Sequence, residues 1–150
     1  MSLHRLLYRS LPEIMGSQGE VAAEVARIVE ASRETNAREG VSGALLVAPG
    51  VFMQVIEGPL PAVERTFERI CGDIRHRHVQ LIDFTCVEQR SFPEWPLAAL
   101  APAGELVRLC ASLEAPQDPL ADPTSASATI QLMRAMALAG GKAAQDRTAA

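Results

Sequence analysis

The sequence lacks the features that zinc-binding, nucleic-acid-binding and membrane-spanning proteins need. It has three cysteines, Cys71, Cys86 and Cys110, which are far apart and form no CxxC pair or Cys/His ligand spacing, so we expect no structural zinc site. The odd number and wide spacing of the cysteines also favour a location in the reducing cytoplasm. Fourteen basic against eighteen acidic residues leave a net charge of −4, and nucleic-acid binding normally requires a clustered basic face. No apolar stretch approaches the ~20 residues that span a bilayer. We therefore expect no nucleic-acid partner and no membrane span.

What is present is typical of a single globular domain. Apolar residues make up 48% of the 150 residues and charged residues 21%. A chain of this length buries roughly two-thirds of the surface that it exposes when unfolded. Pro12 and Glu13 follow the first ten residues before any long apolar run, so we also expect no signal peptide.

The stretch Gly40–Pro59 is the centre of the predicted fold. It contains two predicted strands, Ala44–Ala48 and Val51–Glu57, closed by the turn at Pro49-Gly50. Strand side chains alternate between faces, so Phe52, Gln54 and Ile56 share one face, on which only Gln54 is polar. An unpartnered buried amide costs on the order of 2–7 kcal/mol. Either the protein itself or a ligand with hydrogen-bonding edges must therefore satisfy Gln54.

The remaining periodicity predicts an α+β fold with the ferredoxin-like order βαββαβ(β) and two helices on one face of the sheet. The further predicted strands are Leu3–Ser10, Val79–Val87 and, at an edge after Pro96, Leu97–Ala101. A first helix is expected from about Glu20, with its end marked by Asn36 and Gly40. A second helix is expected after the turn Gly58-Pro59-Leu60-Pro61, and its core face carries Val63, Phe67, Ile70 and Ile74.

The opposite face of the sheet is also apolar and needs a second cover. We expect it from C-terminal helices at Glu105–Glu114 and Ile130–Ala139, joined by a proline-rich linker, Ala115–Ser127. Beyond Gly140-Gly141 we expect a frayed or disordered tail. The sheet residues to be covered are Leu3, Leu7, Val51, Met53 and Val55.

A mostly polar row of residues at helical spacing flanks the predicted core face of each helix. The rows are Ile28, Ser32 and Asn36 on the first helix and Arg69, Asp73 and His76 on the second. If both helices cover the face that bears Tyr8 and Gln54, the two rows border one slot with a phenol and an amide at its floor. A flat heterocycle with donors and acceptors at its edge would suit such a slot.

Five runs in this sequence resemble the BLUF domain, a family of blue-light sensors that bind FAD non-covalently. The resemblance covers residues 3 to about 100 in matching order and spacing. The runs are Leu7-Tyr8-x-Ser10, Ser32-x-x-Thr35-Asn36 through Gly40 to Leu46, Phe52 to Pro59, Arg69-Ile70-x-x-Asp73-x-Arg75-His76, and Arg90-Ser91-Phe92-Pro93-x-Trp95.

The resemblance implies roles for individual residues. Tyr8 matches the tyrosine that donates an electron and a proton to the excited flavin, and Gln54 matches the glutamine that bridges this tyrosine to the flavin ring. Asn36 resembles the asparagine that holds the pyrimidine edge of the ring. The other implied cofactor contacts are Ile28 and Ile70, which would sandwich the ring, and Ser32, Thr35, Phe52, Arg69, Asp73 and His76.

The resemblance also implies a switch rather than an enzyme. After charge recombination the Gln54 amide rotates or tautomerises, and a new hydrogen bond to the flavin carbonyl shifts absorption to the red. Trp95 and Leu97 lie where the family transmits its signal, although Leu97 stands where the family commonly has methionine and Thr35 where it often has a first asparagine. Flavin binding should survive both changes.

The implied organisation is a flavin-binding domain at residues 1–101, a helical cap or output segment at 102–140 and a tail at 141–150. We expect no fused output domain, so the signal would pass to a separate downstream protein or through self-association as a homo-oligomer. The alanine-rich segment Ala126–Ala139 is the expected place for either.

Two other function classes fit a ferredoxin-like fold. An acylphosphatase-like hydrolase would need a phosphate-gripping arginine, for which Arg9 is the candidate, but no glycine-rich cradle lies beside it. An RNA-binding module would need exposed aromatics on central strands and basic surroundings. Tyr8 and Phe52 are the only aromatics on the first three predicted strands, and the chain is acidic.

Overall fold

A computed structural model describes residues 2–12, 17–48, 51–72, 76–100 and 123–148 of the chain. The first helix and the strands lie near their predicted positions, whereas the second helix and the last helix have bounds that differ from the prediction. In chain order the elements are β1 (Leu3–Pro12), α1 (Gln18–Glu39), β2 (Ser42–Ala48), β3 (Val51–Pro59), α2 (Leu60–Cys71), β4 (His76–Val87), β5 (Ala98–Leu100) and α4 (Pro123–Thr148).

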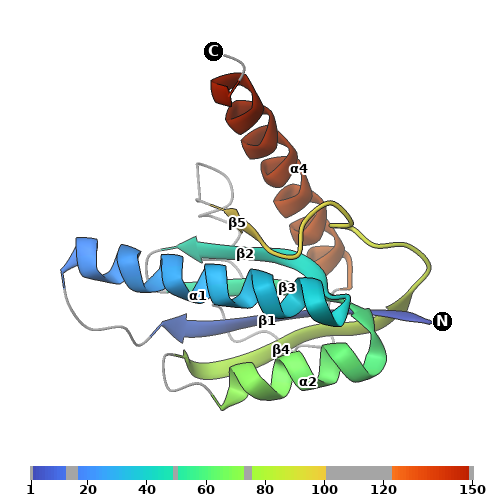
Figure 1. Ribbon diagram of the computed structural model, residues 1–150. Helices are drawn as coiled ribbons and strands as arrows, with labels where there is room; N and C mark the ends of the chain where they lie inside the picture. The colour runs from blue at the N-terminus through green and yellow to red at the C-terminus, as the bar shows by residue number, and fades with distance from the viewer. Residues whose placement is uncertain (1, 13–16, 49–50, 73–75, 101–122, 149–150) are drawn as a thin grey trace.

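The strands form one sheet in the order β4-β1-β3-β2-β5 (Figure 1). The first four strands pair antiparallel, which is the ferredoxin-like arrangement predicted from the sequence. The short strand β5 adds at the edge, parallel to β2, and begins two residues after Pro96. A proline immediately before an edge strand removes no hydrogen bond from the ladder.

The ends of the two helices next to the sheet follow from local residues. Ser17 caps α1, its Oγ accepting a hydrogen bond from the Glu20 N–H at 3.2 Å. Gly40 ends α1 in the left-handed conformation at φ 73°, as predicted from Asn36 and Gly40. Pro61 lies in the first turn of α2, where its missing N–H costs no helical bond, and Gly72 caps the other end.

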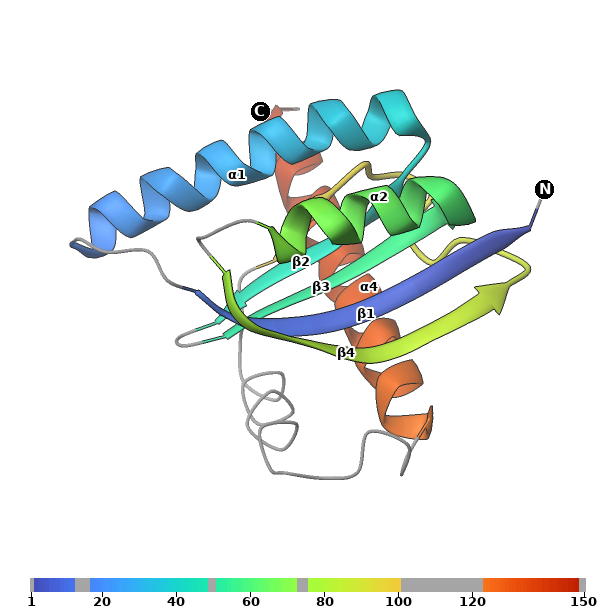
Figure 2. The ribbon, with the colours of Figure 1, turned by 90° about the horizontal axis from the view of Figure 1, so that it is seen from below.

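The two faces of the sheet are covered by different helices (Figure 2). Helices α1 and α2 cover the face that carries Leu6, Tyr8, Phe52 and Ile56. Helix α4 covers the other face, where its buried Ala126, Ile130, Met133 and Ala137 pack against sheet residues that include Leu7, Met53 and Val55. This is the second cover that the apolar pattern of the strands demanded.

Three expectations about element boundaries are wrong. Helix α4 begins at Pro123 and not at Ile130, so Pro123–Ser127 belongs to the helix and not to a linker. It also continues through Gly140-Gly141 to Thr148, where a frayed tail was expected. Glycine disfavours a helix by only about 1 kcal/mol, which neighbouring residues readily offset.

The third correction concerns the second helix, which ends at Cys71. His76 is therefore the first residue of β4, paired with Pro12 of β1, and is not part of a helical row with Arg69. Strand β4 thus starts three residues before the predicted Val79. Pairing with the full length of β1 extends β4 backwards, a contact that periodicity alone does not reveal.

Some predicted features lie outside the described residues. They are the turn Pro49-Gly50, the residues Asp73, Ile74 and Arg75, and the helix expected at Glu105–Glu114. Among the helices described, none combines the length and the apolar character that crossing a membrane requires.

Candidate flavin site

Tyr8 and Gln54 meet on the face covered by α1 and α2. They are directly opposite each other in the antiparallel register of β1 and β3, which places both side chains on the same face. Both are buried, and the Tyr8 hydroxyl donates a hydrogen bond to Gln54 Oε1. The phenol ring also packs against Phe67 of α2, with ring centroids 5.7 Å apart. The predicted partnership of phenol and amide is therefore present.

A cavity of about 400 Å³ lies above this pair, between the sheet and the two helices. Residues of both helices line it: the first predicted row does so at Ile28, Ser32 and Asn36, and the second only at Arg69. Eight of the eleven predicted cofactor contacts are among its walls: Ile28, Ser32, Thr35, Asn36, Phe52, Gln54, Arg69 and Ile70.

The polar side chains that line the cavity differ in whether they already have a hydrogen-bond partner. Thr35 Oγ1 donates to the Ala31 carbonyl of its own helix at 3.2 Å, and Asn36 Nδ2 donates to the Pro96 carbonyl at 2.9 Å. Within the described part of the chain, the Ser32 hydroxyl and the Gln54 Nε2 have no hydrogen-bond partner. These two groups are therefore free to bind a polar ligand.

The α2 wall is tied to α1 by an ion pair that sequence spacing did not predict. The Arg69 guanidinium donates to both Glu39 carboxylate oxygens at 3.2 Å and to Thr66 Oγ1 at 3.3 Å. The hydrogen bond from Arg69 holds the pKa of Glu39 below its ordinary value of 4.5, and the nearby charges of Arg65 and Arg38 act in the same direction. The pair joins the C-terminal ends of the two helices beside the cavity.

The segment before β5 is held by its backbone carbonyls. Gly43 N–H donates to Trp95 O at 3.2 Å, and Asn36 and Arg33 of α1 donate to the next two carbonyls, those of Pro96 and Leu97. Leu97 is buried on the cavity side with Phe52 and Leu45, whereas Trp95 packs against the α4 side. The three hydrogen bonds to the carbonyls of residues 95–97 therefore fix the segment in which the side chains change from the α4 face of the sheet to the cavity face.

The other three predicted cofactor contacts are not among the described residues that line the cavity. Tyr8 lies beneath the cavity wall, bonded to Gln54, and does not line it. Asp73 and the side chain of His76 lie outside what the structure describes. Sequence reasoning missed Thr66, one helical turn before Ile70, and Val25, one turn before Ile28. Helical spacing from the predicted contacts could have found both.

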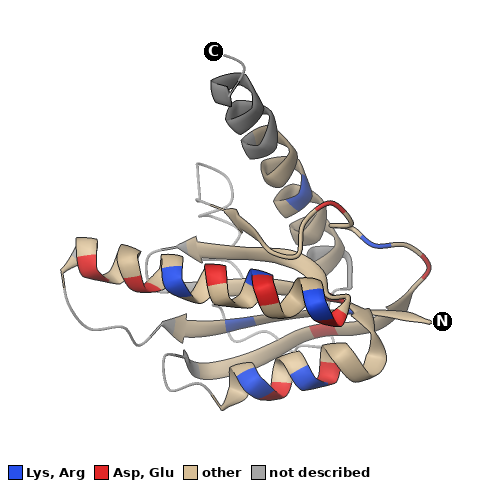
Figure 3. Ribbon diagram, viewed as in Figure 1, with Lys and Arg blue, Asp and Glu red and all other residues tan. Residues whose placement is uncertain are grey.

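The described residues do not form the sites that a hydrolase or an RNA-binding module would need. Arg9 Nε donates to Gln80 Oε1 at 2.8 Å in an exposed cross-strand contact. Tyr8 and Phe52 are buried beneath the helices and cannot stack on nucleotide bases. Acidic and basic residues are interspersed along α1 and α2, so these helices form no single-sign face (Figure 3).

The chemistry of the cavity fits the ring of a flavin. Apolar side chains such as Ile28, Ile70 and Leu97 suit a flat aromatic ring, and free donors at Gln54 and Ser32 suit its carbonyl and nitrogen edge. The sequence family described as BLUF, sensors of blue-light using FAD, matches residues 3–98. The chain belongs to the BLUF family. Its cofactor is FAD.

Solved structures and curated sequences agree with this BLUF assignment. "BlrB - a BLUF protein, dark state structure" is 30% identical, with a TM-score of 0.73 and coverage of 89% of this chain and 96% of that one. "BlsA photo-activated state" has a TM-score of 0.75 at 21% identity, covering 88% and 94% of the two chains, and shows the fold alone. The photoactivated adenylate cyclase subunit beta of Euglena gracilis is 32% identical over 77 residues, 51% of this chain and 9% of that protein. This BLUF chain therefore matches only a small part of its curated relatives.

Proposed function

We propose that this BLUF domain is a non-enzymatic blue-light switch that holds FAD in the cavity between α1, α2 and the sheet and signals to a separate protein. The observation that carries the proposal is the hydrogen bond from Tyr8 to Gln54 at the cavity floor, together with the unpartnered Nε2 of the same amide among the described residues. A single side chain then connects a phenol to whatever the cavity holds.

Several side chains would hold the cofactor. Ile28 and Ile70, from opposite helices, would pack on the two faces of the ring, and Phe52 and Leu97 would close its apolar surroundings. Gln54, Ser32 and Asn36 would bond its polar edge. Thr35 and Arg69 are further wall contacts, and Asp73 and His76 stay predictions from the family pattern.

The switch follows from what Tyr8 and Gln54 can do. Bound FAD supplies a ring that absorbs blue light and then becomes a strong oxidant. Tyr8 would give an electron to the excited flavin and a proton along its hydrogen bond to Gln54 Oε1, and both would return to Tyr8 on charge recombination. While the hydrogen bond between Tyr8 and Gln54 is broken, the amide would be free to rotate or tautomerise, which exchanges the donor and acceptor that it presents to the cavity. A changed hydrogen bond in a buried site is strong enough to persist as a signal.

An absorption spectrum before and after blue illumination tests the proposal. The purified protein, reconstituted with FAD, should show a flavin band that moves to the red in blue light and returns in the dark. Failure to bind any flavin would overturn the proposal. So would a flavin band that illumination leaves in place.

Two variants separate binding from switching. Tyr8→Phe removes the phenol proton and Gln54→Ala removes the amide, and each should abolish the red shift while most FAD binding survives. Glu64→Gln on the exposed side of α2 is a matched control and should behave as the unchanged protein. A normal photocycle in Gln54→Ala would contradict the mechanism.

The output of the switch is the second part of the proposal. The curated relatives that match here are named as photoactivated adenylate cyclase subunits, in which a matching stretch is a small part of a larger protein. By analogy, this domain would regulate an effector, reached through a separate protein or through self-association of α4-bearing domains. Size-exclusion chromatography with light scattering, in the dark and under blue light, distinguishes the two routes.

A further inference from the structure

Glu57 is a buried carboxylate that the proposed switch does not use. It lies on β3 three residues after Gln54, on the opposite face of the sheet, and is fully buried. Its Oε1 accepts hydrogen bonds from Ser42 Oγ at 3.0 Å and from the Phe92 N–H at 2.5 Å, and its Oε2 accepts one from the Ser91 N–H at 2.7 Å. A buried carboxylate without such donors would be strongly destabilising, so the loop at Ser91-Phe92 is held firmly to β3.

Ser91 is contacted by charged side chains from three different elements. Its N–H donates to Glu57 of β3, its Oγ accepts from Arg5 Nη1 of β1 at 3.3 Å, and its carbonyl accepts from Arg134 Nη1 of α4. We refer to Ser91 with Arg5, Glu57 and Arg134 as the Ser91 node. Hydrogen bonds to charged groups are stronger and more directional than neutral ones, so the node couples the positions of the strands to that of the helix.

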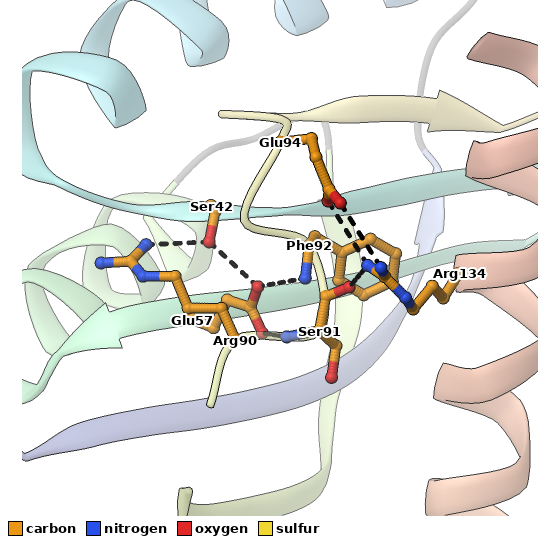
Figure 4. Close-up of polar contacts among 7 residues, drawn as sticks. All are labelled: Ser42, Glu57, Arg90, Ser91, Phe92, Glu94 and Arg134. Carbon is orange, nitrogen blue, oxygen red and sulfur yellow. Dashed lines mark hydrogen bonds and ion pairs between the residues drawn. The ribbon is translucent and has the colours of Figure 1, made fainter. Parts of the chain in front are cut away.

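Helix α4 is joined to this node by Arg134. The buried apolar residues that α4 packs on the sheet are Ala126, Ile130, Met133 and Ala137, and apolar contacts are non-directional. Arg134 adds directional contacts, because it bonds the Ser91 carbonyl and both carboxylate oxygens of Glu94 at 3.4 Å (Figure 4). A shift of Ser91 therefore changes the favoured position of α4.

We propose that the Ser91 node transmits the light-induced change at Gln54 along β3 to α4 and loosens the docking of α4 in the light. The inference rests on the proposed photoswitch. Gln54 and Glu57 share one strand and are about 10 Å apart along it, at roughly 3.3 Å per residue. A change in the Gln54 hydrogen bonds that moves the β3 backbone also moves the carboxylate on which the Ser91 loop is held. Because Glu57 accepts three hydrogen bonds in this structure, a displacement of its carboxylate weakens them.

Hydrogen–deuterium exchange of the FAD-bound protein, in the dark and under continuous blue light, tests the node. In the unchanged protein we expect peptides from residues 126–139 of α4 to exchange faster in the light by about fivefold or more, the lower end of typical allosteric coupling. Arg134→Gln and Glu57→Gln should each abolish this difference while the red shift of the flavin band is retained. Arg38→Gln, an exposed arginine on α1, is the control and should keep both.

The outcomes separate the two proposals. An intact red shift with equal α4 exchange in light and dark overturns the node and leaves the photoswitch standing, and so does a light-dependent difference that survives in Arg134→Gln. Absence of the red shift in the unchanged protein overturns both. If Glu57→Gln does not fold, Arg134→Lys replaces it. Lysine keeps the charge but cannot bond Ser91 and Glu94 with one planar group, so the exchange difference should shrink.

Discussion

At the scale of single residues, the site depends on the register of β1 against β3. Tyr8 and Gln54 are directly paired, and a slip of one residue would send one of them to the α4 face. Glycines help to hold neighbouring strands in place. A Cβ added at Gly43 of β2 would lie 1.9 Å from the Val55 carbonyl oxygen, so the strand can approach β3 only because this residue has no side chain.

Gly43→Ala should therefore destabilise the protein strongly. We expect a loss of about 3 kcal/mol or more in the free energy of unfolding, at or above the upper end of ordinary overpacking, because the clash is with backbone. Urea denaturation followed by circular dichroism measures it. Gly19→Ala in the first turn of α1 is the control. Its Cβ would meet only Ser17 Oγ at 3.9 Å, and it should be neutral or slightly stabilising. Equal midpoints for the two variants would contradict this account of Gly43.

At the scale of elements, the two helices over the cavity are joined where they end. The Glu39–Arg69 pair links the last turn of α1 to the last turn of α2, and Asn36 and Arg33 link α1 to the segment before β5. The cavity walls are therefore held by contacts between elements as well as by their packing on the sheet.

The Glu39–Arg69 link should depend on pH. Because Arg69 lowers the pKa of Glu39 in the folded protein, its contribution to stability is present above the ordinary value of 4.5 and is lost as the pH falls through the lowered value. Glu39→Gln should cost under ~1 kcal/mol at pH 7, since the pair is partly exposed, and this cost should shrink toward zero in acid. Urea unfolding at several pH values measures it. Glu34→Gln on the exposed face of α1 is the control and should cost less than about 0.5 kcal/mol at pH 7. A cost of Glu39→Gln that grows in acid would exclude the assignment.

At the scale of the whole molecule, α4 belongs to the fold and is not an appendage. The sheet face that it covers carries fully buried residues such as Leu7, Met53 and Val55, which would lie open to water without it. Burial of about 25 cal/mol per Å² of apolar surface makes such a cover a large part of the stability. Any light-driven loosening of α4 must therefore be partial, a change of docking and not a detachment.

Met133→Ala tests the contribution of this cover. Met133 is fully buried in α4, so we expect a loss of about 2–4 kcal/mol in the free energy of unfolding, while the flavin absorption spectrum of the FAD-bound protein stays unchanged. Leu138→Ala, in the same helix but 42% exposed, should change stability by less than about 0.5 kcal/mol. A Met133 variant as stable as the unchanged protein would mean that α4 is not a true second cover.

The sequence alone determined the order of the elements and the family, because strand alternation, helical spacing and motif order are local properties. That Tyr8 and Gln54 share a face depends on the register of β1 against β3, which the tertiary structure supplies. The sequence also indicated that both faces of the sheet needed a cover. It did not determine where α2 ends or how far α4 extends, because glycine and proline signals are weak and packing overrides them.

Only the tertiary structure decided which groups bond which. Glu39 with Arg69, Asn36 with the Pro96 carbonyl, and Ser91 with Arg134 join residues 30, 60 and 43 positions apart. A periodic pattern assigns a side chain to a face, but its partner depends on how whole elements approach each other. The sequence likewise could not predict that Trp95 packs on the α4 side and Leu97 on the cavity side of the sheet. Their positions depend on the hydrogen bonds that other elements make to the backbone carbonyls of this segment.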